Sequence, residues 1–529
     1  MPAAYRPGEI DGELVDWSVG TFLRKMAAEI PDHVALKGVR DPLSGVQKSW
    51  TYSSLLNDAE RVAATLLTHF KPGDHVALWC SNRPEWALVQ FGMALSGLVL
   101  VAVNPASRAH ELEHALLQSD AVGIVLAETF RDTNAVALLE GVRPRLPLLR
   151  QAFLIDDLTN AAPGGDLPVF PVVDPASAAM IQFTSGTTGR AKAAMLSHRG
   201  LVNIAQFTAT RFALPMGSVW LNWLPMFHTG GSVFALMGCM WNHGTLVLIN
   251  GFDPVEVMRT IAEERPAWMP LVPTTAIALL DHPDRPNYDL SSLAVLTQGG
   301  TPVAAELIDR LERELNVDHV VVFGQTETSS TICLGVRGDD RYHKTETVGK
   351  PMPHTEIRIV DPISNAMVEF GEVGEIQVRS CAVTMGYYGQ PDETAKAIDP
   401  EGWLHTGDLG TIEPDGYLKI TGRLKDVIIR GGENIYPREI EDLLVQHPGI
   451  AEAAVFGIPH ERWGETPIVA LRCRAGYEID HGAICEFLEP MLARYKIPQG
   501  VWHVDAMPVT LSGKIQKFML RDQYLAASR

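Results

Sequence analysis

The feature that most restricts the fold of this chain is the alternation of short apolar runs with segments of helical spacing. Residues 75–80 read HVALWC and residues 98–103 read LVLVAV, and both runs are short and rich in residues that favour strands. Between them, the apolar residues of the segment 84–95 recur at helical spacing. We expect Ser81 or Asn82 to cap the start of this helix. A strand–helix–strand unit of this kind is typical of parallel sheets.

The same alternation returns several times in the first two thirds of the chain. Segments of helical spacing lie directly before or after short apolar runs at 122–127, 268–272, 292–298 and 319–323. This order predicts an α/β fold, with a large N-terminal domain of mostly parallel, doubly wound sheets. Such sheets bind ligands at the carboxyl ends of their strands, and three Gly- and Thr-rich segments follow strand-like runs in this sequence.

The character of the sequence changes after about Phe370. Short strand-like runs then alternate with Gly, Pro and Asp turns, and further helical segments follow. We therefore expect an N-terminal domain at 1–422, whose part from about 345 to 422 is a β-rich subdomain. A join at 423–427 would connect it to a small α+β C-terminal domain at 428–529.

Composition narrows the classes of function. The chain has 529 residues, of which 46% are hydrophobic and 20% charged, and these values are ordinary for a globular protein. Its formal net charge is −19 at pH 7. Because nucleic-acid binding depends on Lys and Arg side chains that neutralise phosphates, no nucleic-acid partner is expected. A local site for a single nucleotide is compatible with this charge.

Cysteine usage and the N-terminal residues favour a cytoplasmic protein. The six cysteines are scattered and form no CxxC pair or Cys/His cluster, which is typical of reduced thiols. The first residues, MPAAYRPGEI, lack the basic-then-apolar order of a signal peptide. The longest strongly apolar run, Met93–Val103, is about half of what a membrane span requires, so no transmembrane segment is expected.

The segment TSGTTGRAK at 184–192 has the composition of a polyphosphate site. Its glycines allow a tight turn that points several backbone N–H groups at one anion. The hydroxyl groups of Thr184, Ser185, Thr187 and Thr188 are additional donors, and a lysine ends the segment. The alternative is an ordinary Ser/Thr/Gly surface turn.

The same segment does not match a Walker A loop. Ala191 stands where that loop has its second glycine, and Ala193 replaces the Ser or Thr that binds the metal. A P-loop NTPase is therefore disfavoured.

Seven ordered segments closely resemble the motifs of the adenylate-forming enzymes, which include acyl- and aryl-CoA synthetases, peptide-synthetase adenylation domains and beetle luciferases. The resemblance covers nearly the whole chain and implies ATP, Mg²⁺ and coenzyme A as co-substrates or cofactors. The matching segments are TSGTTGRAK (Thr184–Lys192), WLPMFHTGG (Trp223–Gly231), QGGTPV (Gln298–Val303), FGQTET (Phe323–Thr328), GWLHTGD (Gly402–Asp408), GRLKDVIIRGGENIYPREIE (Gly422–Glu441) and PVTLSGK (Pro508–Lys514).

The resemblance implies an ATP site. The TSGTTGRAK segment would hold the β- and γ-phosphates, the QGGTPV segment would border the adenine against the ring of Phe323, and Thr326 would contact the α-phosphate. Glu327 would bind Mg²⁺, and Asp408, with Arg423 close by, would accept hydrogen bonds from the ribose hydroxyls. The residues assigned to the nucleotide are Thr184, Ser185, Gly186, Thr187, Thr188, Gly189, Lys192, Gly299, Gly300, Thr301, Phe323, Gly324, Gln325, Thr326, Asp408, Arg423 and Lys514.

The resemblance also implies two half-reactions that a mobile C-terminal domain serves in turn. Attack of a carboxylate on the α-phosphate of ATP joins two anions, so cations are required, and Lys514 would supply one. Rotation at a hinge, Lys425, would then withdraw it and bring Gly431 and Gly432 to the pantetheine of coenzyme A. His228 would be an aromatic gate between the acid site and the CoA tunnel. The residues expected to be catalytic are Lys514, Glu327, His228 and Thr184.

Taken singly, several of these residues have ordinary interpretations. Glu327 would be a solvated surface acid, Asp408 a turn residue and His228 a structural histidine. Lys514 would be an exposed lysine of the tail. Their order within a matching chain favours the functional interpretation.

The motifs favour an acid–thiol ligase, that is, an AMP-forming acyl-CoA synthetase. FGQTE is closer to the CoA ligases than to peptide-synthetase domains, and the region Phe227–Met240 has no acidic residue to pair with an α-amine. We expect a fatty or aromatic acid without an amine as substrate. The expected pocket walls are Trp223, Phe227, Val233, Val272–Thr274 and Ser329–Cys333.

Several alternatives stay open. A stand-alone acyl-AMP ligase would load a carrier protein, a luciferase-like enzyme would use oxygen, and a non-catalytic protein would only bind the nucleotide. The oligomeric state is open as well, although homodimers are common among soluble enzymes. The PVTLSGK context resembles synthetases silenced by acetylation, so a lysine acetyltransferase acting on Lys514 is a further hypothesis.

Overall fold

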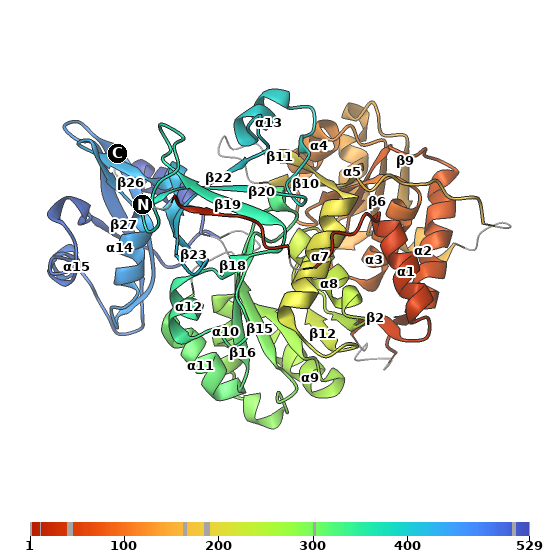
Figure 1. Cartoon of the computed structure of the whole chain (residues 1–529), viewed down its shortest axis with the longest axis horizontal. Helices are drawn as coiled ribbons and strands as arrows, with labels where there is room; N and C mark the ends of the chain where they lie inside the picture. Colours follow the sequence, from red (N-terminus) through yellow and green to blue (C-terminus); the bar gives the residue numbers. More distant parts are fainter. Residues whose placement is uncertain are drawn as a thin grey trace.

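The computed structural model describes residues 3–10, 12–39, 46–161, 167–184, 191–299, 303–509 and 515–527, which form a large lobe and a smaller C-terminal lobe (Figure 1). The first sheet of the large lobe is parallel from β10 to β9, with antiparallel strands at one edge. Its strand order is β21 (Gly386–Tyr387), β11 (Lys192–Ser197), β10 (Ala178–Thr184), β5 (Val99–Val103), β4 (His75–Trp79), β6 (Gly123–Leu126) and β9 (Gln151–Leu154).

The second sheet of the large lobe has a parallel centre, from β16 to β2, and antiparallel strands at both edges. Its strand order is β18 (Lys350–Pro351), β17 (Cys333–Leu334), β16 (Asp318–Phe323), β15 (Val295–Gly299), β14 (Trp268–Leu271), β12 (Val219–Asn222), β13 (Thr245–Leu248), β2 (Val34–Gly38) and β3 (Ser49–Thr51).

The hydrophobic core of the large lobe lies in three layers of side chains. Because side chains alternate across a strand, Val76 and Leu78 of β4 pack into the layer between the two sheets, whereas Ala77 and Trp79 pack into an outer layer. The layer between the sheets contains α1 (Val19–Glu29), α2 (Tyr52–Leu67), α3 (Pro84–Leu95), α7 (His198–Phe212) and α8 (Leu236–Trp241). The outer layers contain α4 (Ala109–Gln118) and α5 (Ala135–Val142) on the first sheet, and α9 (Pro254–Glu264), α10 (Pro273–Leu280) and α11 (Ala305–Leu315) on the second.

An antiparallel sheet lies between these layers and the C-terminal lobe (Figure 1). It includes the N-terminal strand, whose Tyr5 hydroxyl donates a hydrogen bond of 2.7 Å to Glu356. Its strand order is β1 (Tyr5–Arg6), β19 (Thr355–Val360), β20 (Gly374–Ser380), β22 (Leu404–Ile412) and β23 (Leu418–Arg423). Two short helices accompany it, α12 (Arg341–Glu346) and α13 (Pro391–Ala397).

The C-terminal lobe is a small α+β unit with its own apolar core. A single 3-10 turn, η5 (Leu424–Asp426), separates the last strand of the antiparallel sheet from the first strand of this lobe. The strands are β25 (Glu433–Ile435), β24 (Ile428–Arg430), β27 (Gly464–Cys473) and β26 (Ile450–His460), with β28 (Val501–His503) beside β27, and the helices are α14 (Pro437–Leu444), α15 (His481–Leu488) and α16 (Lys517–Ala527). The expected join at 423–427 thus falls where the chain changes sheets, whereas the domain boundaries and their motion stay predictions.

The predicted fold class is confirmed, because the large lobe combines mostly parallel sheets with an antiparallel one and the C-terminal lobe is α+β. One local expectation is wrong. The N-cap of α3 is Arg83, without a side-chain cap, and the amide of Asn82 bonds elsewhere. Helix α3 is also buried on every side from Glu85 to Leu95, because helices and sheets enclose it within the central layer.

Two further expectations concern membranes and thiols. Within the described parts of the chain, no helix combines the length and apolar character needed to cross a bilayer. All six cysteines are free; Cys80, Cys239 and Cys333 are buried, and the other three are partly buried.

Candidate active site

The ends of the TSGTTGRAK segment lie on neighbouring antiparallel strands. Thr184 ends β10 and pairs with Lys192, which begins β11. Residues 185–190 lie outside the described residues, so Ser185, Gly186, Thr187, Thr188 and Gly189 stay predictions. A Walker A loop leads from a strand into a helix, whereas this segment leads from one strand into its neighbour. The strand pairing therefore agrees with the exclusion of a P-loop NTPase.

Lys192 is held by two side chains from the segment after β20. Its Nζ lies 2.6 Å from Oε2 of Glu393 and 4.8 Å from the centre of the Tyr387 ring. The ammonium groups of Lys192, first, and Lys396 lower the pKa of Glu393 to about 2. The carboxylate is therefore charged at neutral pH and keeps the lysine charge compensated.

Tyr387 connects this lysine to Glu327. Its hydroxyl donates a hydrogen bond of 2.9 Å to Oε1 of Glu327. Burial, followed by the charge of Glu327, raises the pKa of Tyr387, so the phenol keeps its proton and acts as the donor. Lys192 and Glu327, which lie far apart in the sequence, thus contact the same aromatic side chain. Sequence reasoning missed Tyr387 and Glu393, because no spacing signal links GYYGQPDET to either partner.

The turn that carries Glu327 depends on a glycine. A Cβ atom at Gly324 would lie 1.8 Å from the carbonyl oxygen of Ser330, so a larger residue has no room. The short helix η4 (Thr326–Thr328) follows, and the backbone carbonyl of Glu327 accepts a hydrogen bond of 2.7 Å from Thr384 N–H. Tight backbone packing therefore fixes Glu327. The preceding residue Phe323, expected to face adenine, is 9% exposed.

Asp408 and Arg423 form a cross-strand ion pair. They are opposite each other on β22 and β23, and Arg423 Nε lies 3.0 Å from Asp408 Oδ1. Asp408 is buried and Arg423 is about half exposed, with side-chain exposures of 7% and 46%. Asp408 and Arg423 lie close to each other, as predicted. Their contact with ribose stays a prediction.

The expected adenine segment is described only at its start. Gly299 ends β15 opposite Val322, and a Cβ atom there would lie 2.3 Å from a methyl carbon of Val322. Gly300 and Thr301 lie outside the described residues. The preceding Gln298 is fully buried, and its Oε1 lies 2.8 Å from Nε2 of the buried His319.

Asn82 positions the start of the WLPMFHTGG segment, Trp223–Met226, which is expected to border the acid. The Asn82 amide donates to the carbonyls of Trp223 at 3.2 Å and Leu224 at 2.9 Å, and its Oδ1 accepts from Met226 N–H at 2.8 Å. Two residues later, the ring of His228 lies 4.2 Å from that of Phe227, centre to centre. The gate role of His228 and the pocket walls stay predictions.

The predicted hinge and CoA residues lie at the start of the C-terminal lobe. Burial, and then the charge of Arg423, lower the pKa of Lys425. Gly431 has φ +62° and packs against Trp463, whose ring a Cβ atom would approach to 2.9 Å, while Gly432 has φ +92°. Both glycines thus occupy conformations that other residues rarely adopt.

The catalytic lysine candidate, Lys514, lies outside the described residues, as do 510–513. The residues on either side of that stretch are paired, because Val509 bridges Ile515 and Gln516 N–H donates to Pro508 O at 2.8 Å. The two ends of the chain that flank this stretch therefore lie side by side.

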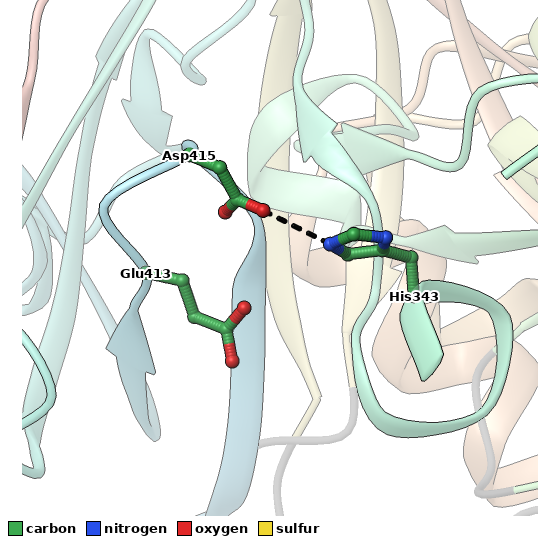
Figure 2. Close-up of side chains that lie close together, drawn as sticks. All are labelled: His343, Glu413 and Asp415. Atoms are coloured by element: carbon green, nitrogen blue, oxygen red, sulfur yellow. Dashed lines mark hydrogen bonds and ion pairs between the residues drawn. The ribbon is translucent and has the colours of Figure 1, made fainter. Parts of the chain in front are cut away.

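A second group of titratable side chains, His343, Glu413 and Asp415, lies on α12 and the β22–β23 hairpin (Figure 2). His343 Nε2 lies 3.0 Å from Asp415, and its Nδ1 lies 3.0 Å from Asp340. Both ring nitrogens of His343 already face carboxylates of the chain, and this group joins α12 to the β22–β23 hairpin.

The fold of two lobes, with mostly parallel sheets in the larger one, is that of an adenylate-forming enzyme. The model of the AMP-binding enzyme family matches residues 23–388, and that of the AMP-binding enzyme C-terminal domain matches residues 439–514. The chain belongs to the AMP-binding enzyme family.

Relatives and solved structures agree with this assignment. YngI of Bacillus subtilis, which carries the name of an acyl-CoA synthetase, is 36% identical over 541 residues, with 97% of this chain and 98% of YngI covered. The mouse mitochondrial medium-chain acyl-CoA ligase ACSF2 is 32% identical over 555 residues, with 98% and 89% covered. The o-succinylbenzoate CoA synthetase MenE of Bacillus subtilis, solved with its acyl-adenylate intermediate, has a TM-score of 0.83 and 27% identity over 97% of this chain and 98% of MenE. The predicted class of enzyme, an acyl-CoA synthetase of this family, is confirmed.

Proposed function

We propose that this chain joins a carboxylic acid without an amine to coenzyme A, through an acyl-adenylate made from ATP. The observation that carries the proposal is the convergence of Lys192 and Glu327 on Tyr387. Tyr387 thereby contacts both a cation at the end of the TSGTTGRAK segment and a carboxylate suited to a metal. A site for a metal–nucleotide complex requires both groups.

Glu327 fits the proposed Mg²⁺ contact. One of its carboxylate oxygens accepts from Tyr387, and its backbone is held by Thr384, so the second oxygen has a defined direction. Mg²⁺ takes few protein carboxylates when it also binds phosphate oxygens, and when bound it neutralises the charge that develops on them.

The adenylation step joins two anions, the acid and the triphosphate. In this proposal Lys192 holds the outer phosphates and Lys514 bridges the substrate carboxylate and the α-phosphate. Asp408, which is buried and oriented by Arg423, accepts from the ribose hydroxyls. These residues position the acid oxygen for attack, and pyrophosphate leaves.

The thioester step uses the same large lobe with a rotated C-terminal lobe. The turn at Leu424–Asp426 is the proposed hinge, with Lys425 at its centre. Gly431 and Gly432 then line the path of the pantetheine, because glycines let a backbone approach a ligand closely. Support comes from the CoA ligase names of the relatives.

The proposed acid is aliphatic or aromatic. The region Phe227–Met240 carries no acidic side chain for an amine, and its segment Val233–Met240 is buried with apolar residues. Mouse ACSF2 is a medium-chain acyl-CoA ligase by name, so medium-chain fatty acids are the first candidates.

An assay of AMP and pyrophosphate formation over a panel of acids, with and without CoA, tests the proposal. The expected result is pyrophosphate release with a subset of amine-free acids, and acyl-CoA only when CoA is present. Transfer to a phosphopantetheinyl carrier protein but not to CoA would favour the carrier-loading alternative. Nucleotide binding without pyrophosphate release for any acid would favour a non-catalytic protein. A cytoplasmic location, self-association and acetylation of Lys514 stay predictions.

A further inference from the structure

The segment from β21 to α13 contacts both charged groups of the proposed MgATP site. Glu393 lies in the first turn of α13 and contacts Lys192 Nζ at 2.6 Å. Tyr387 belongs to β21 and reaches Glu327 through its hydroxyl. One short stretch of chain thus holds a cation from the start of β11 and a carboxylate from the turn η4, which follows β16.

This segment is itself fixed against the strand that begins with Lys192. Gly386 and Tyr387 pair with β11, and Tyr387 N–H donates a hydrogen bond of 2.9 Å to Thr394 Oγ1 of α13. Gly386 has φ +120°, and a Cβ atom there would lie 2.5 Å from a Thr394 methyl carbon. Helix α13 therefore packs closely on β21, and its first turn is fixed relative to β11.

We propose that Glu393 and Tyr387 are positioning residues of the MgATP site, with Glu393 orienting Lys192 and Tyr387 orienting Glu327. The inference rests on the proposed function. A lysine side chain has four rotatable stem bonds, so an ammonium without a fixed partner samples many positions. One hydrogen bond to Glu393 restricts it and leaves two N–H donors for phosphate oxygens.

Two physical effects of Glu393 oppose each other. The carboxylate repels an incoming polyphosphate, which weakens binding, and it also orders the lysine that the polyphosphate contacts. The Lys192 side chain is only 19% exposed, so its charge would be poorly compensated by water without Glu393. We therefore expect the orienting effect to prevail, and removal of the Glu393 charge to weaken MgATP binding.

Titration calorimetry of MgATP with the full chain tests this inference, because binding needs neither the acid nor CoA. Glu393→Gln should bind MgATP about three- to fivefold more weakly than the unaltered chain. Asp392→Asn is the matched control, since it removes an exposed carboxylate from the same first turn, and its affinity should be unchanged. In a Lys192→Met background only the repulsion between Glu393 and the polyphosphate remains. Glu393→Gln should therefore cause no further loss of affinity there, and a slight gain.

Tyr387→Phe tests the second contact. It keeps the ring beneath Lys192 and removes only the hydroxyl, so half-maximal ATP binding should require about tenfold more Mg²⁺. Binding of Mn²⁺ in the presence of ATP, followed by electron paramagnetic resonance, should weaken in parallel. Thermal unfolding of each variant reports whether it folds as the unaltered chain does.

Several results would overturn the inference. Equal or tighter MgATP binding by Glu393→Gln would show that repulsion prevails, and equal weakening by Asp392→Asn would show a general charge effect. A loss that persists with methionine at 192 would show that Glu393 does not act through the lysine. An unchanged Mg²⁺ requirement in Tyr387→Phe would show that Tyr387 does not position Glu327. An unaltered chain that binds no MgATP would reject the proposed function as well, whereas the other results leave that function standing.

Discussion

Asn82 ties separate segments of the large lobe together through one amide group. Besides its contacts with the Trp223–Met226 segment, its amide nitrogen lies 3.2 Å from the carbonyl oxygen of Ile249, which follows β13. Asn82 is 9% exposed, and its hydrogen bonds to Ile249 and Met226 are buried. A buried backbone donor or acceptor that loses its partner costs more than the hydrogen bond itself contributes.

Replacement of Asn82 by alanine should therefore lower the stability of the fold and weaken binding of the acid substrate. We expect a loss of about 2 kcal/mol in the free energy of unfolding, because Met226 N–H loses its acceptor. The KM for the acid should rise more than the KM for ATP, since the segment Trp223–Met226 becomes less well ordered. Asn57→Ala, at an exposed position of α2, is the control and should change neither quantity. Equal changes in both KM values would contradict this role.

At the scale of elements, tight turns and helix starts determine how the site is supported. The turn after β16 requires Gly324 because a backbone carbonyl occupies the place of a side chain. The start of α7 is joined to α1, because Nδ1 of the buried His198 accepts a hydrogen bond of 3.2 Å from Val19 N–H. Neither contact is visible in the local sequence pattern.

Gly324→Ala should disrupt the turn that carries Thr326 and Glu327. Forcing the extra methyl group against Ser330 should cost about 2 kcal/mol or more and should weaken MgATP binding, as calorimetry and thermal unfolding would record. Gly141→Ala is the control, because a Cβ atom at that position in α5 meets nothing within 4 Å. Alanine there should leave stability unchanged or raise it slightly. A Gly324→Ala variant that binds MgATP normally would contradict the packing argument.

The contact between α1 and α7 should make stability depend on pH. Burial lowers the pKa of His198 from 6.5 to about 4, so the folded state favours the neutral ring. Its contribution is complete above the unfolded pKa of about 6.5 and is lost as the pH falls from there towards 4, by about 2–3 kcal/mol. His198→Asn keeps an acceptor for Val19 and cannot titrate, so its thermal midpoint should fall less than that of the unaltered chain over this range. The buried His319, with the same pKa direction, should leave part of the acid sensitivity in place.

At the scale of the whole molecule, one short turn joins the two lobes. Helix α14 lies against β23, and the join at Leu424–Asp426 leads directly from the strand of Arg423 into the small lobe. A rotation about this turn would move the entire C-terminal lobe without disturbing the core of either lobe, because each has its own apolar cluster.

Lys514→Ala should separate the two half-reactions. Adenylate formation should fall by at least about a hundredfold, because the cation proposed to bridge the acid carboxylate and the α-phosphate is lost. Transfer to CoA from supplied acyl-adenylate should be largely retained. Arg494→Ala, which removes an exposed cation of the same lobe, is the control and should affect neither step. Equal loss of both half-reactions would refute the assigned role.

The order of motifs and the period of the apolar residues determined the fold class and the family. These signals are local, because a strand, a helix or a Gly-rich turn is set largely by a few neighbouring residues. The family resemblance of the motifs implied the proximity of Asp408 and Arg423, which belong to two strands joined by a short hairpin.

Only the tertiary structure decided which distant side chains support the site. The strand Tyr5–Arg6 pairs with β19, and Glu393 contacts Lys192. Asn82 bonds to the segment Trp223–Met226 instead of capping α3. Each of these contacts joins segments far apart in the chain, and only the packing of the whole large lobe brings those segments together. Such packing depends on the shapes of many side chains at once, whereas a helix or a turn depends on a few residues in sequence.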